Sequence, residues 1–239
     1  MDQNVILVET VPLEFDLESL GCRLRIRPGQ TKFMDRLSRL AEEAARVARP
    51  KAVARLCGLT ILDEEKVQVG EVTFSSPLLR QKMDGLGRAF PYLASEGTEL
   101  ADWSLSLSSS LEQVFASALR EVAVQQAENL LERTLLERYG IAQVSAMNPG
   151  SLKVWSLEEQ VLLFELLAPL PEKLGVTLLP SLMMRPEYSV SGVFFQTDSK
   201  FYNCQLCQKR VPQPQDSLFG HLRVGQAMLL KRIGGPCRD

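Results

Sequence analysis

Side chains able to act as acid, base or nucleophile are scarce in this sequence. His221 is the one histidine among 239 residues, so a Ser-His or Cys-His pair would have to include it. The spacing of the side chains shows no nucleophile–base pair. The sequence therefore gives little support to an independent small-molecule enzyme.

The five cysteines are scattered, apart from the Cys-x-x-Cys pair of Cys204 and Cys207. A tetrahedral zinc site needs four ligands, and His221 and Cys237 could supply the other two only at loose spacing. One Cys-x-x-Cys without a second pair is a weak metal signal, and no βαβ pattern indicates a redox dithiol. Two free thiols is the favoured interpretation, and a metal site at Cys204 and Cys207 is the alternative.

Two short segments have residue types suited to lie against a ligand. Pro149-Gly150 predicts a turn, in which proline fixes φ and glycine lets the backbone pass close to another group. Ser189 and Ser191 alternate in a predicted strand, so both hydroxyls should project from one face. Gly192 leaves room there for a backbone or a ligand.

Two predicted helices would position these segments. The first spans Ser110–Tyr139, begins with a capping box of Ser110 and Gln113, and stops at Gly140. The second, Leu157–Ala168, is apolar nearly all round and should be buried. The charges on the outer side of the first helix predict a solvated face, made by Glu128, Glu132, Arg133, Glu137 and Arg138.

The chain around the second helix predicts a helix laid against a β-hairpin. Ser156 and Glu159 form a second capping box. Trp155 at the helix entry is expected in the core, with stacking on a ligand as the alternative. After the helix come two apolar strands, Val176–Met184 and the one that starts at Ser189, joined at residues 185–188.

The N-terminal half carries both strand and helix signals. Val5–Phe15 predicts an edge strand, and Thr31–Ala48 predicts an amphipathic helix with Thr31 as its cap. Lys51–Phe74 reads as strands with a turn at residues 63–65.

The stretch Phe90–Trp103 joins the two halves. Ser95-Glu96-Gly97 is interpreted as a strand end and a turn, with Glu96 and Glu99 solvated rather than paired. A ligand-facing loop at the same place is the alternative.

Bulk composition excludes several classes of protein. The apolar fraction of 45% and the charged fraction of 23% are those of an ordinary soluble domain. With a net charge of −2, the chain lacks the excess of positive charge that is typical of nucleic-acid-binding proteins. No apolar run approaches a membrane span, and an acidic Asp2 stands where a signal peptide would be basic. These features predict a cytoplasmic protein.

The order of the motifs resembles a known family. Pro-Gly, then Trp-Ser-Leu-Glu-Glu-Gln, then a strand ending in Met-x-Pro, then Ser-Val-Ser-Gly, is similar to the activation domain of cobalamin-dependent methionine synthase. Asn203-Cys204-x-x-Cys207 resembles a signature of that domain's free-standing relatives. The resemblance implies an α+β fold with an antiparallel sheet and packed helices. It divides the chain into an N-terminal α/β portion, 1–95, and an activation-domain-like core with a Cys-x-x-Cys tail, 96–239, together one compact domain.

The resemblance also implies a site for S-adenosylmethionine. In the family, an Arg-Pro-x-Pro-Gly-Tyr loop holds that ligand, and alignment on Pro149-Gly150 puts Ala146 at the Arg and Ser151 at the Tyr. The long helix contributes polar groups, for which Gln125, Gln126 and Glu128 are the candidates. The implied binding residues, including those that face the corrinoid, are Ala146, Asn148, Pro149, Gly150, Ser151, Ser189, Ser191 and Gly192.

The function implied is that of an accessory protein in corrinoid-dependent methyl transfer. The chain would dock on the cobalamin carried by a separate methyltransferase and support its reductive reactivation, with electrons from a flavodoxin- or ferredoxin-type protein. Ala146 lacks the charge that the family's Arg offers to a carboxylate. The alternative is therefore a binding or assembly module for a corrinoid protein that has lost S-adenosylmethionine.

Overall fold

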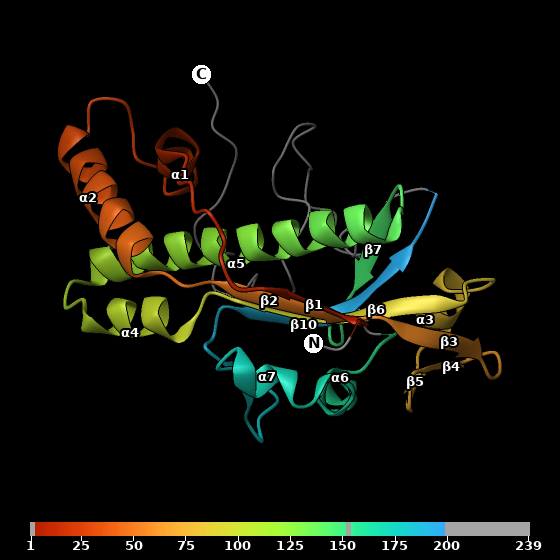
Figure 1. Ribbon diagram of the computed structural model, residues 1–239. Helices are drawn as coiled ribbons and strands as arrows, with labels where there is room; N and C mark the ends of the chain where they lie inside the picture. Colours follow the sequence, from red (N-terminus) through yellow and green to blue (C-terminus); the bar gives the residue numbers. More distant parts are fainter. Residues whose placement is uncertain (1–2, 152–153, 199–239) are drawn as a thin grey trace.

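A computed structural model describes residues 3–151 and 154–198 of the chain. Its centre is an eight-stranded sheet with the order β1-β2-β6-β3-β4-β5, extended on the other side of β6 by β10 and then β7 (Figure 1). Every pairing in the sheet is antiparallel. The strands are β1 Val5–Val8, β2 Lys51–Arg55, β3 Cys57–Ile61, β4 Lys66–Val69, β5 Val72–Ser75, β6 Arg88–Ser95, β7 Val144–Met147 and β10 Ser189–Gln196.

The two longest strands, β6 and β10, lie side by side in the middle of the sheet. Val190 pairs with Ala94 and Phe194 with Phe90 in one continuous register. Both strands are buried over nearly their whole length, because helices cover both faces, and their near-continuous apolar runs reflect this. One sheet thus takes strands from both portions that the sequence suggests, 1–95 and 96–239.

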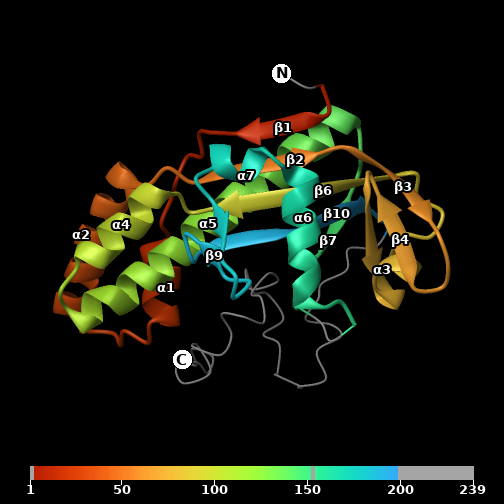
Figure 2. The same ribbon diagram turned by 90° about the horizontal axis from the view of Figure 1, so that it is seen from below.

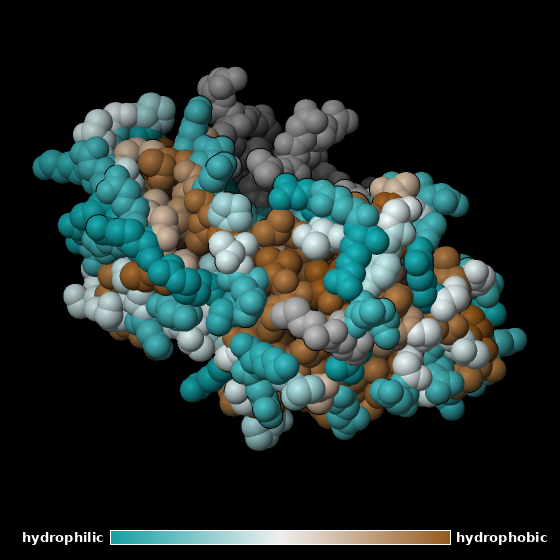
Figure 3. Space-filling view, in the orientation of Figure 1, coloured by the Kyte–Doolittle hydropathy of each residue, from teal (hydrophilic) through white to brown (hydrophobic). Residues whose placement is uncertain are grey.

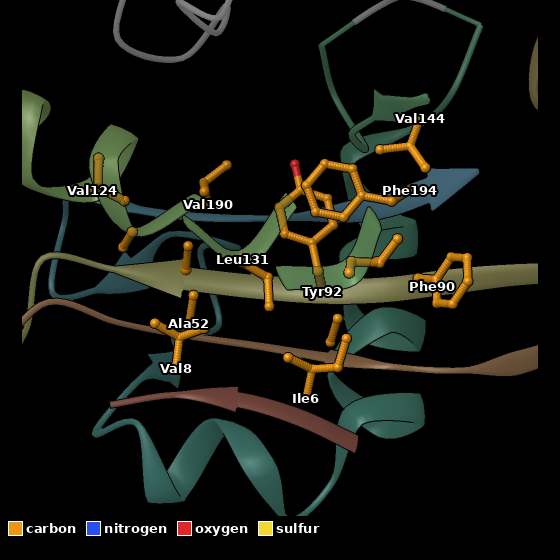
Figure 4. Close-up of a cluster of buried hydrophobic side chains, with 14 of the residues drawn as sticks. Ile6, Val8, Ala52, Phe90, Tyr92, Val124, Leu131, Val144, Val190 and Phe194 are labelled. Carbon is orange, nitrogen blue, oxygen red and sulfur yellow. The ribbon is translucent and has the colours of Figure 1, made fainter. Parts of the chain in front are cut away.

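One face of the sheet is covered by the long helix α5, Ser110–Tyr139 (Figure 1). Its bounds are those predicted from the sequence, and Gly140 ends it in the left-handed conformation with φ 62°. The core beneath it is shown in Figure 4, where Tyr92 lies against Phe194 in the middle of the cluster. The ring centroids of these two residues are 3.9 Å apart and the rings are stacked.

The opposite face carries η1 Leu157–Glu159, α6 Gln160–Leu167 and α7 Leu170–Lys173 (Figure 2). Trp155 is fully buried, as predicted, and packs edge-to-face on Phe74 with 5.6 Å between ring centroids. A short helix, α3 Pro77–Lys82, follows β5.

A third layer lies at one end of the sheet, where three helices pack on the N-terminal half of α5 (Figure 1). The buried side chains at these contacts are mostly apolar, as the helical spacing of leucine and alanine in the second helix predicts. Ion pairs of Arg23 with Glu121, and of Arg36 and Arg39 with Glu112, also join the first two helices to α5. They are α1 Leu17–Arg23, α2 Thr31–Val47 and α4 Thr98–Ser106.

Two strand predictions differ from the structure. The edge strand expected over Val5–Phe15 does form at the edge of the sheet, but it ends at Val8, because its partner strand starts at Lys51 and no ladder continues beyond the pair Val8–Ala52. The expected hairpin of Val176–Met184 with the strand at Ser189 does not form. Instead β8, Thr177–Leu178, pairs with β9, Met184–Arg185, and β10 joins the main sheet.

The helix caps also differ in detail from those predicted. Ser109, not Ser110, is the N-cap of α5, and the amide of Gln113 donates to the carbonyls of Ser104 and Leu107. Gln30 rather than Thr31 precedes α2, without a side-chain cap. Ser156 does cap its helix, by accepting from the backbone N–H of Glu158.

Figure 3 shows the face of the molecule that carries the β1 edge, where apolar side chains gather over β1 and the neighbouring part of α5. Arg138 reaches this edge from α5 and donates to the carbonyls of Gln3 and Val5 at 2.6 and 3.0 Å. In the described part of the chain, no helix is both long and apolar enough to cross a membrane.

Candidate ligand-binding cavity

A cavity of about 540 Å³ opens where β7 stops short of the end of β10. The last pair of that ladder is Met147–Val193, so residues 189–192 extend beyond β7. The chain leaves β7 there and makes the turn 148–151, which forms one wall. The other walls come from α1 and the segment before it, from residues 121–129 of α5, and from residues 182–191.

The turn 148–151 is built by its own hydrogen bonds. Ser151 Oγ donates to the carbonyl of Asn148 at 2.6 Å, and the N–H of Gly150 donates to the carbonyl of Trp155 at 2.9 Å. Gly150 has φ 74°, and a Cβ at this position would lie 2.9 Å from Cδ1 of Leu157. A side chain there would be strained and crowded, which explains the glycine.

A buried chain of polar groups runs beneath this turn. Asn148 Nδ2 donates to the carbonyl of Ser191 at 2.7 Å and to Tyr92 Oη at 3.0 Å. The Tyr92 hydroxyl lies 2.6 Å from Glu128 Oε1. Glu128 lines the cavity, yet it is only 8% exposed. The prediction that Glu128 lies on a solvated face is therefore wrong, because the cavity wall covers this part of α5.

The wall at residues 187–191 is anchored to the end of β6. Ser189 Oγ donates to the carbonyl of Pro186 at 2.8 Å, and its hydroxyl is hydrogen-bonded to that of Ser95 at 2.9 Å. Tyr188 and Glu96 exchange two bonds: the N–H of Tyr188 donates to Glu96 Oε1, and the N–H of Glu96 donates to the carbonyl of Tyr188.

Glu96 itself is held by a buried ion pair. Arg120 donates to both carboxylate oxygens at 2.6 and 2.7 Å, and the Glu96 side chain is 0% exposed. The guanidinium of Arg120 also lies 4.4 Å from the ring centroid of Tyr188. Burial raises the pKa of Glu96, and the bonds from Arg120 act against that shift. The prediction that Glu96 is solvated is wrong, whereas Glu99 is exposed.

The segment around α1 forms the far wall and was not found from the sequence. Arg23 Nη2 pairs with Glu121 Oε2 at 2.5 Å, and burial raises the pKa of Glu121. The amide of Gln126 bridges the backbone of Glu14, accepting at 3.1 Å and donating at 2.5 Å. These contacts fix α1 to α5 across the cavity.

The lining is rich in acidic groups. Among the described lining residues the one cation is Arg23, which is paired with Glu121. A ligand carboxylate would therefore meet no uncompensated positive charge, whereas a ligand cation would be favoured. The carboxylates that line the cavity belong to Glu14, Asp16, Glu121, Glu128 and Glu187.

The structure brings together most of the residues expected at the binding site. Two of them do not line the cavity. Ala146 pairs with Phe194 in β7 and packs against the core, and the space above Gly192 is filled by the amide of Asn148. The residues that do line it are Asn148, Pro149, Gly150, Ser151, Ser189 and Ser191, with Gln125, Gln126 and Glu128 from α5.

The pair Cys204 and Cys207 lies outside the described residues, as do His221 and Cys237. Within residues 3–151 and 154–198, no group of three or more histidine, cysteine or acidic side chains could hold a metal ion.

Comparison with solved structures shows which fold this is. One similar structure is described as the crystal structure of the MetH reactivation domain bound to AdoHcy. The TM-score is 0.57 at 17% sequence identity, and the match covers 83% of this chain and 80% of that one. No family model and no curated protein matches the sequence. The chain thus has the α+β fold of that reactivation domain, with an antiparallel sheet and packed helices.

Proposed function

We propose that this chain is an accessory protein of corrinoid-dependent methyl transfer. It docks over the cobalamin of a separate methyltransferase, supports reductive reactivation of the cobalt, and binds S-adenosylmethionine in the cavity beside the turn 148–151. The observation that carries the proposal is the position of this cavity, between α5 and the start of β10, in a fold similar to a reactivation domain described as bound to AdoHcy.

Size and lining are consistent with a nucleoside-type ligand. A volume of about 540 Å³ lies within the range of small-molecule sites, roughly 300–1,000 Å³. The carboxylates of the lining suit the sulfonium and ammonium charges of S-adenosylmethionine. In this scheme the chain positions a methyl donor above the cobalt and excludes water, the cobalamin belongs to the partner, and electrons come from a flavodoxin- or ferredoxin-type protein.

Calorimetric titration with S-adenosylmethionine and AdoHcy tests the ligand. We expect a micromolar dissociation constant, equivalent to about 8 kcal/mol of binding free energy. A constant weaker than about 1 mM, or roughly 4 kcal/mol, would remove the ligand from the proposal.

Two glycine variants locate the site in the same assay. G150A should weaken binding, because the new Cβ meets Leu157 and displaces the turn. G85A is the matched control, since Gly85 has the same φ of 74° but nothing lies within 4 Å of its Cβ position. Equal effects of the two variants would argue against a site at the turn.

A second candidate function is a docking or assembly module for a corrinoid protein that no longer binds S-adenosylmethionine. Ala146 favours it, because this residue is packed against the core and the one cation among the described lining residues, Arg23, is already paired with Glu121. This module would bind the purified cobalamin domain of a methyltransferase with or without AdoHcy. The preferred function requires both ligands to bind, and failure to bind the cobalamin domain would exclude both candidates.

A further inference from the structure

The side chain of Asn148 fills the space above Gly192, which has no side chain of its own. A Cβ on Gly192 would lie 1.9 Å from Asn148 Nδ2 and 2.4 Å from the carbonyl oxygen of Met147. Only glycine therefore lets the amide lie on β10 and donate to the carbonyl of Ser191. Asn148 is 4% exposed, so its position is fixed by burial as well as by hydrogen bonds.

The direction of the hydrogen bonds can be assigned from the chemistry of the groups. Asn148 Nδ2 can only donate, so Tyr92 Oη accepts from it. The single proton of the Tyr92 hydroxyl then goes to Glu128 Oε1, 2.6 Å away. The Tyr92 ring cannot turn aside, because it is fully buried and stacked on Phe194. A rigid chain of donors thus ends on a carboxylate of the cavity wall.

We infer that Asn148 and Tyr92 are positioning residues of the cavity. Together they hold the turn 148–151 on the sheet and orient Glu128, so that this carboxylate accepts a hydrogen bond from an ammonium group of the ligand. The inference rests on the proposed function for the identity of the ligand, but the arrangement of the three side chains does not depend on it. Tyr92 lies behind the wall and does not itself line the cavity.

The charges of the lining select the ammonium group over other donors. Arg23 is compensated by Glu121, and the other charged side chains among the described lining residues, Glu14, Asp16, Glu128 and Glu187, are all acidic. A cationic donor gains from this field as well as from the hydrogen bond, and charge-assisted bonds are about twice as strong as neutral ones.

The test removes one hydroxyl and compares two ligands. Y92F keeps the ring against Phe194 and deletes only the group between Asn148 and Glu128. AdoHcy and 5′-methylthioadenosine are titrated against both proteins; the second is a nucleoside thioether that lacks the ammonium and the carboxylate. We expect Y92F to bind AdoHcy about tenfold more weakly than the wild type, and to bind 5′-methylthioadenosine as well as the wild type does.

A second tyrosine supplies the matched control. Tyr139 packs on Phe90 in the same core cluster, and its hydroxyl has no partner among the described residues. Y139F should therefore leave both affinities unchanged. An equal loss of affinity for both ligands in Y92F would overturn the inference, since it would mean that Tyr92 only supports the fold. Unchanged binding of AdoHcy by Y92F would overturn it too.

A ligand-free measurement separates this inference from the proposed function. The side-chain amide protons of Asn148 should exchange slowly with solvent in the full-length wild type, and faster in Y92F, as observed by NMR. If the wild type binds no AdoHcy and these protons are protected, the proposed function fails and the positioning arrangement is supported. If they exchange as fast as an exposed amide, the inference is overturned whatever the ligand does.

Discussion

The carboxylate of Glu96 is fully buried, and Arg120 compensates its negative charge. The two side chains form two short hydrogen bonds, and Arg120 also contacts the ring of Tyr188. Removing one partner of such a pair leaves an uncompensated charge in a poorly polarisable interior. This pair connects the end of β6, α5 and the cavity wall at 187–189, so its loss should affect both the fold and the site.

We predict that R120M lowers the free energy of unfolding by about 3–5 kcal/mol at pH 7. The bonds from Arg120 hold the pKa of Glu96 down against burial, so without them the pKa rises further. A folded-state pKa above the unfolded one gives stability below the unfolded pKa, and this stability is lost as pH rises through the folded pKa. The deficit of R120M should therefore be larger at pH 7 than at pH 4.5.

Urea unfolding at the two pH values measures this difference. R39M is the control, because Arg39 is 59% exposed and Glu112 keeps its contact with Arg36. Its effect should stay within about 1 kcal/mol at both pH values. A deficit of R120M that does not change with pH would show that Glu96 is not the group responsible.

At the scale of the elements, β10 and the turn 148–151 depend on each other through Gly192. The strand provides the carbonyl of Ser191, and the turn provides the amide that binds it. Any side chain at position 192 has to displace Asn148 or the backbone carbonyl of Met147.

G192A should therefore lower the free energy of unfolding by about 2–3 kcal/mol, as overpacking of a filled space does. G58A, in β3, is the matched strand glycine with nothing within 4 Å of its Cβ position, and it should be neutral or raise stability by up to about 1 kcal/mol. Chemical denaturation of both variants measures the contrast. Equal stabilities would mean that the amide of Asn148 does not occupy the space above Gly192.

Local signals explain which elements could be predicted from the sequence. The bounds of α5 were correct because one chain segment contains both the apolar stripe and the terminating Gly140. The hairpin was wrong because the apolar run of β10 is equally compatible with a neighbouring strand and with β6, which lies far away in sequence. The hydrophobic pattern of one strand does not identify a partner strand that is distant in the sequence.

The candidate site, too, was predictable only where its residues have a local sequence signal. The Pro149-Gly150 turn and the serines of β10 have such signals, and the structure places them on the cavity wall. The pairs Glu96–Arg120 and Arg23–Glu121 join elements that are distant along the chain, and charged residues in a helix give no sign of their partners. Ala146 is assigned to the site by alignment alone, whereas in the structure it is partly buried and packs against the core.

At the scale of the whole molecule, the cavity and the β3–β5 region lie at different places along the sheet. The cavity lies between α1, α5 and the start of β10, whereas β3, β4, β5 and α3 contribute to a separate core cluster at the other end of the sheet. Figure 2 shows β3, β4 and α3 at one end of the molecule and α1 toward the other. A ligand in the cavity would thus touch segments that are far apart in sequence and leave the β3–β5 region untouched.

Hydrogen exchange of the full chain with and without AdoHcy follows from this layout. A ligand at 100 times its dissociation constant stabilises the ligand-binding conformation by about 2.7 kcal/mol. The free energy of local opening at the ligand's contacts rises by the same amount, so the amides there exchange more slowly. We expect slower exchange in residues 14–23, 148–151 and 182–191, and no local change over Cys57–Ile61, Lys66–Val69 or Val72–Ser75. ATP is the control, because its triphosphate would meet the carboxylates of the lining and should protect nothing. Protection confined to the β3–β5 region would place the ligand elsewhere, and equal protection by ATP would show that the cavity does not select by charge.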